Sequence, residues 1–187
     1  MRPRFLPRLQ TERTVLKLLE PRDALMMARF RVENRDHLTR WEPRRSPEFY
    51  TAGYWELQLR ASIRDFRNGV AVPLVIVDSL ESEVLGVCNF TNIVRGTFQS
   101  CHLGYALAGR HEGQGLMYEA LQPAIAYVFN ELHLHRVIAN YLPHNERSGR
   151  LLEKLGFEIE GRARKLLKIN GEWEDHVMTS LINPESC

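Results

Sequence analysis

The sequence lacks the long apolar segments that place a protein in a membrane or direct it out of the cell. Its 187 residues contain no apolar run of about 18 residues, the length of a membrane span. The first eight residues, MRPRFLPR, do not form the apolar core of a signal peptide. We therefore predict a cytoplasmic protein without a membrane partner.

Cysteines and metal-ligand patterns are also scarce. The three cysteines, Cys88, Cys101 and Cys187, are odd in number and show no Cys-x-x-Cys spacing, which indicates reduced thiols. Cys101-His102 and His133-Leu134-His135 do not assemble into a four-ligand pattern. We expect no metal ion.

Neither charge sign is in clear excess, since 25 lysines and arginines stand against 23 acidic residues and give a net charge of +2. This balance requires no polyanionic partner. Arginine is nevertheless concentrated in one region, at Arg40, Arg44, Arg45, Arg60, Arg64 and Arg67. This arginine group is either a solvated face or a basic rim turned toward a nucleic-acid-associated substrate.

The composition is that of an ordinary globular protein, with 44% hydrophobic and 26% charged residues. The length suits one domain with a substantial core. We expect a proline- and arginine-rich, poorly ordered arm over residues 1–10, a single domain over residues 11–182 and a tail over residues 183–187.

The stretch from Leu103 to Leu132 organises the chain. An apolar alternation over residues 103–107 is followed by Gly113-x-Gly115 and then by apolar residues three or four apart. This pattern predicts a strand, a tight glycine turn and a helix. Glycines adopt backbone angles closed to other residues and leave room for a ligand, so backbone N–H groups can surround a phosphate at the helix start.

The glycine turn differs from two better-known phosphate loops. A dinucleotide loop needs a third glycine where Tyr118 stands, and a Walker loop needs Gly-Lys-Ser/Thr. Arg110-x-x-Gly113-x-Gly115 after a strand instead resembles the acetyl-coenzyme A signature of the GNAT acetyltransferases. The resemblance implies acetyl-CoA as co-substrate, with its pyrophosphate on the loop amides and its pantetheine arm along the preceding strand. The implied cofactor-binding residues are Leu103, Gly104, Tyr105, Arg110, His111, Glu112, Gly113, Gln114, Gly115, Leu116, Asn145 and Ser148.

The remaining chain alternates strand and helix patterns. Strands are predicted over about residues 12–19, 70–77, 84–90, 97–107, 136–141, 164–169 and 172–181, and helices over 21–34, 54–68, 116–132 and 146–155. Asn170-Gly171 predicts the turn of a closing hairpin, and Pro123 predicts a kink in a helix. The fold class is α/β (α+β), a mixed, mostly antiparallel central sheet with helices on both faces. The resemblance, over roughly residues 11–182, implies strands splayed apart at the cofactor site.

A second motif extends the resemblance. Asn145-Glu146-Arg147-Ser148, followed by Leu155-Gly156-Phe157 and Gly161, looks like the family's Asn-x-x-Ser and Leu-Gly-Phe-x-x-x-Gly. Residues 41–43, 86–96, 139–145 and 171–176 are similar to the RimJ-type branch, which acetylates the N-terminal alanine of a ribosomal protein. The resemblance thus implies that activity, a ribosomal protein N-terminus as partner and an arginine group facing the small ribosomal subunit.

Acetyl transfer needs a neutral amine, a donor to the tetrahedral oxyanion and a proton for the leaving thiolate. The resemblance assigns the oxyanion to a backbone N–H near Gly104 and Tyr105, and the proton to Ser148. From the residues alone, Ser148 could equally satisfy backbone amides in the first turn of its helix. Asn145 could be the helix N-cap, a cofactor contact or both.

No motif identifies the general base. Glu42 is a candidate, although it could be a plain surface carboxylate, and it forms the predicted substrate-binding set with Trp41, Asn89 and Asn140. Trp41 could instead fill the edge of the core. An α-amine with a pKa of ~7.7–8.0 is about one-tenth neutral at pH 7, whereas a lysine at ~10.4 is neutral in fewer than about one molecule in a thousand. The lack of a strong base therefore favours an α-amine substrate.

Two other functions remain open from the sequence. The protein could acetylate a small-molecule amine, which strongly acidic pocket residues would favour. It could also be a ribosome-associated assembly factor that retains coenzyme A binding without turnover, a hypothesis that the arginine group permits.

Overall fold

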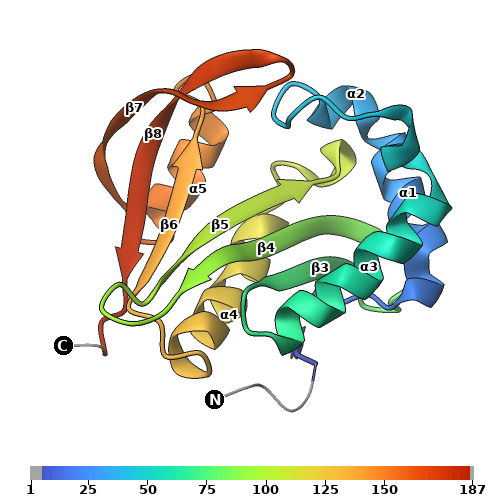
Figure 1. Cartoon of the computed structure of the whole chain (residues 1–187), viewed down its shortest axis with the longest axis horizontal. Coiled ribbons are helices and arrows are strands. Elements are labelled where there is room, and N and C mark those ends of the chain that lie inside the picture. Colours follow the sequence, from blue (N-terminus) through green and yellow to red (C-terminus); the bar gives the residue numbers. More distant parts are fainter. Residues whose placement is uncertain (1–5, 186–187) are drawn as a thin grey trace.

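The computed structural model describes residues 6–185, which form one eight-stranded sheet in the order β1-β2-β3-β4-β5-β6-β8-β7. Figure 1 shows helices on both faces of this sheet. The strands are β1 (Arg8–Gln10), β2 (Thr14–Lys17), β3 (Val72–Asp78), β4 (Val84–Val94), β5 (Ser100–Leu107), β6 (Arg136–Tyr141), β7 (Glu158–Ile169) and β8 (Glu172–Ile182). The helices are α1 (Ala24–Glu33), α2 (Arg35–Leu38), α3 (Ala52–Arg67), α4 (Leu116–Asn130) and α5 (Glu146–Lys154). Three short 3₁₀ turns are η1 (Pro21–Asp23), η2 (Pro47–Tyr50) and η3 (Gly109–His111).

The pairing of β5 with β6 sets this sheet apart from a fully antiparallel one. All other neighbouring strands are antiparallel, so the predicted mixed, mostly antiparallel sheet is confirmed. The parallel contact is short, because only residues 100–102 of β5 pair with residues 136–138 of β6. Farther along, β5 pairs with β4 alone and β6 with β8 alone. The two strands therefore separate, as the family resemblance implied.

Alternation along the strands divides the core into two layers. Leu74 and Ile76 of β3 face the layer that contains α4 and α5, whereas Val75 and Val77 face α1 and α3. The helix α4 runs through Pro123 and buries a continuous apolar stripe against the first layer. Helices on both faces are thus a consequence of strands that are apolar on both sides.

The predicted arm over residues 1–10 is wrong for its last part. Residues 8–10 form β1 and pair with β2 from Arg8 opposite Lys17 to Gln10 opposite Val15. Three residues are too few for a periodic signal, so tertiary pairing decides this strand. Residues 1–5 of the arm and residues 186–187 of the tail lie outside the described residues. At the start of the predicted tail, Asn183 is buried and donates from Nδ2 to the carbonyl of Leu134 at 3.2 Å.

Two other boundaries differ from prediction. Strand β7 begins at Glu158 rather than near residue 164, because it is an edge strand with most side chains exposed and two register shifts, which hide its alternation. The segment over residues 37–50, for which the sequence predicted neither strand nor helix, contains the end of α2 and all of η2, and only residues 39–46 between them are irregular. Within residues 6–185, none of the helices has the length and hydropathy needed to cross a membrane.

Candidate functional site

The glycine loop joins β5 to α4 through η3, as the pattern predicted. Gly113 and Gly115 have φ angles of 74° and 76°, and Gly115 directly precedes the first residue of α4. A Cβ added at Gly113 would meet no atom within 4 Å. Glycine is therefore required at this position by its left-handed backbone, and the space beside it is open to a ligand.

The turn between β1 and β2 braces the glycine loop. Arg13 donates to the carbonyl of Gln114 at 3.1 Å and forms an ion pair with Glu119 in the first turn of α4 at 2.6 Å. Thr11 donates to the same carboxylate at 2.6 Å. Partial burial raises the pKa of Glu119, but the hydrogen bonds from Thr11 and Arg13 outweigh it and the net pKa is lowered. An acidic anchor thus holds the loop at the positive end of the helix.

The charged side chains of the loop bind other parts of the protein. Arg110 forms ion pairs with Glu83 and, at 3.6 Å, with Glu33. Glu112 pairs with Arg147 of α5 and approaches Nε2 of His37 in α2 at 3.3 Å. A cofactor contact from Arg110 or Glu112 would therefore come through the backbone in this arrangement.

His111 and Gln114 complete the predicted loop contacts. Burial, followed by the charge of Arg110, lowers the pKa of His111, which favours the neutral imidazole. The side-chain amide of Gln114 donates to the carbonyl of Arg110 at 2.9 Å. This hydrogen bond stabilises the turn, so Gln114 has a structural role within the loop.

The opening between β5 and β6 begins after His102 and Ile138, the last pair in register. Beyond them, Leu103 is buried on the α4 side, while Gly104 is exposed and a Cβ added there would meet no atom within 4 Å. Residues 103–107 thus present a backbone edge toward β6 with space around Gly104. An extended ligand could pair with such an edge.

A hydroxyl pair lies across this opening. The phenolic oxygen of Tyr105 on β5 is 2.6 Å from Oγ of Ser148 on α5. Burial raises the pKa of Tyr105 to about 12, although the hydrogen bond from Ser148 acts in the opposite direction. Tyr105 is therefore a neutral phenol at physiological pH and can donate a proton. From the sequence, Tyr105 was expected to contribute its backbone N–H, and the role of its hydroxyl was not predicted.

Asn145 is the N-cap of α5. Its side-chain Oδ1 accepts from the backbone N–H of Ser148 at 3.1 Å, and its carbonyl accepts from that of Gly149 at 3.1 Å. The N-cap interpretation is confirmed. Because Oδ1 of Asn145 accepts the hydrogen bond from the backbone amide of Ser148, the hydroxyl of Ser148 can form its hydrogen bond with Tyr105.

Two predicted substrate residues lie on the sheet face that carries Gly104. Asn89 is directly opposite Gly104 in the β4–β5 pairing. Asn140 lies two residues beyond the last residue of β6 that pairs with β5, and its Oδ1 is buried without a hydrogen-bond partner among residues 6–185. A buried acceptor without a partner is unfavourable, so a substrate amine or a water molecule would stabilise it.

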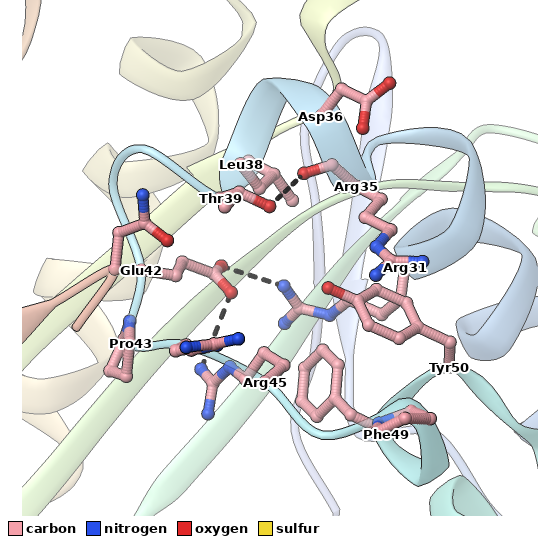
Figure 2. Close-up of a pocket in the computed structure, with 13 residues that line it drawn as sticks. Arg31, Arg35, Asp36, Leu38, Thr39, Glu42, Pro43, Arg45, Phe49 and Tyr50 are labelled. Carbon is pink, nitrogen blue, oxygen red and sulfur yellow. Dashed lines mark hydrogen bonds and ion pairs between the residues drawn. The ribbon is translucent and has the colours of Figure 1, made fainter.

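The other two predicted substrate residues, Trp41 and Glu42, lie between α2 and η2. The ring of Trp41 stacks on His144, with centroids 5.6 Å apart, immediately before the N-cap of α5. Glu42 forms an ion pair with Arg31 at 2.9 Å and approaches Arg45 at 3.5 Å, as Figure 2 shows. Both carboxylate oxygens of Glu42 therefore contact arginines. Arg31 gave no signal in the sequence, because an arginine in a surface helix usually faces solvent, as Arg29 of the same helix does.

Cysteines and metal ligands play no visible part in the site. Cys88 and Cys101 are buried free thiols, and burial raises the pKa of both. Within the described part of the chain, His, Cys, Asp and Glu side chains form no group of three that could hold a metal ion. Cys187 lies outside that part.

Comparisons with known proteins give one consistent result. The family model described as "Acetyltransferase (GNAT) domain" matches residues 13–158. The chain is 44% identical over 178 residues to the [Ribosomal protein uS5]-alanine N-acetyltransferase of Escherichia coli (strain K12), covering 95% of this chain and 92% of that protein.

Solved structures agree with the relatives found by sequence. The ribosomal-protein-S5-alanine acetyltransferase of Vibrio fischeri has a TM-score of 0.92 and 37% identity, covering 97% of this chain and 99% of that one. Mycobacterium smegmatis RimJ, solved in complex with CoA-disulfide, has a TM-score of 0.87 and 26% identity over 96% of this chain and 88% of that one. The fold is therefore similar to that of proteins of one enzyme class.

Proposed function

This chain belongs to the GNAT acetyltransferase family, and on that premise we propose that it acetylates the N-terminal α-amine of a ribosomal protein that begins with alanine. The names of the Escherichia coli and Vibrio fischeri relatives support this substrate. The structural observation that best supports the chemistry is the hydrogen bond between Tyr105 and Ser148, because these hydroxyls lie beside the separation of β5 from β6 and either can donate a proton.

The co-substrate is acetyl-CoA, which supplies the acetyl group as a reactive thioester. The open, left-handed glycines at 113 and 115 suit a pyrophosphate at the start of α4. The unpaired edge of β5 over residues 103–107 suits the amide groups of a pantetheine arm. The CoA-disulfide bound to the Mycobacterium smegmatis relative supports this choice of co-substrate.

The hydroxyls of Tyr105 and Ser148 act together as the proton donor. Ser148 lies in the first turn of α5 and can give its proton to a departing thiolate, while Tyr105, with a pKa of about 12, passes its proton to Ser148 and regains one through water from the proton that the amine loses. The backbone at Gly104 and Tyr105 offers N–H groups to the oxyanion beside them. One pair of hydroxyls thus links β5 to α5 beside the opening between β5 and β6.

Deprotonation of the substrate needs only a weak acceptor. Asn140 has a buried Oδ1 without a described partner and can accept a hydrogen bond from the α-amine or from a water molecule that removes its proton. Glu42 stays a candidate base, but its ion pairs with Arg31 and Arg45 favour a structural role. An α-amine is already partly neutral near pH 7, so this arrangement suffices.

The basic pocket beside Trp41 is unfavourable to the small-amine alternative. Four arginines and two acidic residues line the pocket around Glu42, and a polyamine would be repelled there. A polypeptide N-terminus carries one positive charge, and that charge can lie outside this pocket, beside Asn140. The pocket therefore favours a polypeptide over a polycation.

We propose that the arginine group helps the enzyme meet its substrate on the small ribosomal subunit, in the cytoplasm. On α3, Arg60 pairs with Glu56 and Arg64 pairs with Asp65, so these two arginines contribute less to the positive potential of the surface. Arg67 forms no ion pair among residues 6–185, and Arg40 stacks over Trp41 at 5.3 Å. Binding to ribosomal particles that weakens steeply with salt would support this contact, whereas salt-independent binding would contradict it.

The test of the proposed activity is a peptide panel. The purified protein is incubated with acetyl-CoA and peptides that begin with Ala, Ser, Thr or Met, together with an N-blocked lysine peptide. Mass spectrometry is expected to place the acetyl group on the α-amine of the Ala peptide and not on the lysine. Binding of acetyl-CoA without acetylation of any peptide would contradict the proposed function and favour the assembly-factor hypothesis.

A further inference from the structure

A pocket of about 560 Å³ lies among α1, α2, η2 and the turn between β7 and β8, and its lining is unusually rich in arginine (Figure 2). Building on the proposed function, we propose that this pocket binds an acidic side chain of the polypeptide substrate, a few residues beyond the acetylated amine. Its arginines are Arg31, Arg35, Arg44 and Arg45, and its acidic residues are Asp36 and Glu42.

The charges of the pocket are not balanced from within. Glu42 forms ion pairs with Arg31 at 2.9 Å and with Arg45 at 3.5 Å. Arg35 and Arg44 form no ion pair with any residue that the structure describes. Figure 2 shows Asp36 at one end of the pocket, away from the arginines that surround Glu42. Positive charge therefore remains for an incoming carboxylate.

Aromatic rings hold two of these arginines in position. The guanidinium of Arg35 lies over the ring of Tyr50 at 4.7 Å, and that of Arg45 lies over the ring of Phe49 at 4.5 Å. Stacking fixes the plane of a guanidinium and leaves its N–H groups at the edge, where a carboxylate can accept two parallel hydrogen bonds. The pocket is thus preorganised for a planar anion.

Arg31 supplies a second, independent sign of a ligand. Its side chain is only 7% exposed, and its Nε is buried without a hydrogen-bond partner among residues 6–185. A buried N–H of a charged group is unfavourable unless it is paired. Glu42 occupies one terminal nitrogen of Arg31, so an acceptor in the pocket would complete its hydrogen bonds.

The pocket is connected to the acetyl-transfer site through adjacent residues. Trp41 stacks on His144, which directly precedes the N-cap of the helix that carries Ser148, and the next residue, Glu42, lines the pocket. An extended peptide advances ~3.3 Å per residue, so roughly six residues span about 20 Å, and the experiment below covers the first six residues of the substrate. Phosphates of nucleic acid are bound chiefly by exposed side chains, whereas Arg31 is recessed.

The experiment uses peptide pairs that begin with Ala and carry either Glu or Gln at one position from the second to the sixth. We expect one position at which Glu raises kcat/KM and tightens binding by about tenfold over Gln. Arg35→Gln and Arg44→Gln should each bring this Glu/Gln ratio close to one. Arg29→Gln, which removes an exposed arginine of α1 outside the pocket, should keep the ratio.

Equal values for Glu and Gln at every position would overturn the acidic subsite, as would a ratio that survives in the Arg35→Gln, Arg44→Gln double variant. A short RNA that binds in competition, without any preference for Glu peptides, would also overturn it and assign the pocket to phosphate. Failure of the proposed function is distinguishable, because peptide affinity measured by calorimetry decides the subsite even if no peptide is acetylated.

Discussion

The side of the molecule built from β5, α4 and α5 differs in construction from the side built from α1, α2 and η2. On the first side, the loop and the hydroxyl pair come from a contiguous run, residues 100–156, in which glycines and caps set the geometry. On the second, the key contacts join separate elements: Arg31 to Glu42, Trp41 to His144, and the backbone N–H of Asn170 to the carbonyl of Glu42 at 2.9 Å. Backbone geometry sets the glycine loop on the first side, the proposed cofactor side, and the Arg13 brace and the Tyr105–Ser148 pair add tertiary contacts to it. The second side, the proposed acceptor side, is built by side-chain contacts throughout.

This difference indicates on which side of the molecule substrate specificity can change. A loop defined by left-handed backbone angles tolerates few substitutions, because side chains other than glycine are strained there. A pocket defined by side-chain contacts can alter its charge while the backbone stays in place. We therefore expect relatives to share the cofactor side and to vary on the acceptor side, and four predictions test this contrast.

The largest effect is expected for Glu42→Gln on the acceptor side. This substitution leaves the buried guanidinium of Arg31 without its counter-charge and should lower the free energy of unfolding by about 3 kcal/mol. Urea denaturation measures the change. Glu56→Gln, which breaks an exposed pair with Arg60, is the control and should have little effect. Unchanged stability together with lost turnover would instead identify Glu42 as the general base.

On the cofactor side, removing either hydroxyl of the pair should slow the chemical step. Ser148→Ala and Tyr105→Phe are each expected to lower kcat by about 100-fold and to leave acetyl-CoA affinity within about twofold. Because the two hydroxyls act as a unit, the double variant should be little worse than either single one. Tyr127→Phe on α4 is the control. Wild-type kcat in Ser148→Ala would make Ser148 a bystander.

A smaller effect is expected from the loop itself. Gly113→Val forces a β-branched residue into a backbone with φ of 74° and should weaken acetyl-CoA binding by about 30-fold, measured by calorimetry. Gly53→Val is a matched control on α3, where a Cβ would meet no atom within 4 Å and φ is not left-handed. If Gly113→Val binds as tightly as the native chain, the loop does not hold the phosphates.

The smallest effect concerns the anchor beneath the loop. Glu119→Gln should lower the free energy of unfolding by about 1 kcal/mol at pH 7, because hydrogen bonds from Thr11 and Arg13 favour the carboxylate. The folded pKa of Glu119 is lowered, so this contribution is fully present above the unfolded value of ~4.3 and is lost as the pH falls through the folded value. Denaturation at pH 7 and pH 3 should show a larger difference between native and variant chains at pH 7 than at pH 3.

The sequence predicted those features of the structure that depend on residues close together in the chain. The glycine turn, the cap at Asn145, the left-handed Gly156 after α5 and the hairpin at Asn170-Gly171 all depend on short-range geometry, and each lies where it was expected. The resemblance to a family added the splayed strands, which no periodicity encodes.

The missed features all need a partner in another element of the fold. Tyr105 and Ser148 are 43 residues apart, and the sequence around neither residue indicates that their hydroxyls form a hydrogen bond. Arg31 is buried because Glu42 neutralises it, and β1 exists because β2 offers an edge. In each case burial or pairing by another segment outweighs the local preference.

The separation of β5 from β6 has a consequence beyond catalysis. A continuous open sheet has two outer edges, whereas this one adds two inner edges with unpaired backbone donors and acceptors, over residues 103–107 and 139–141. Unpaired edges are templates on which proteins aggregate. A ligand that fills the gap would therefore act as a missing strand and cover both inner edges.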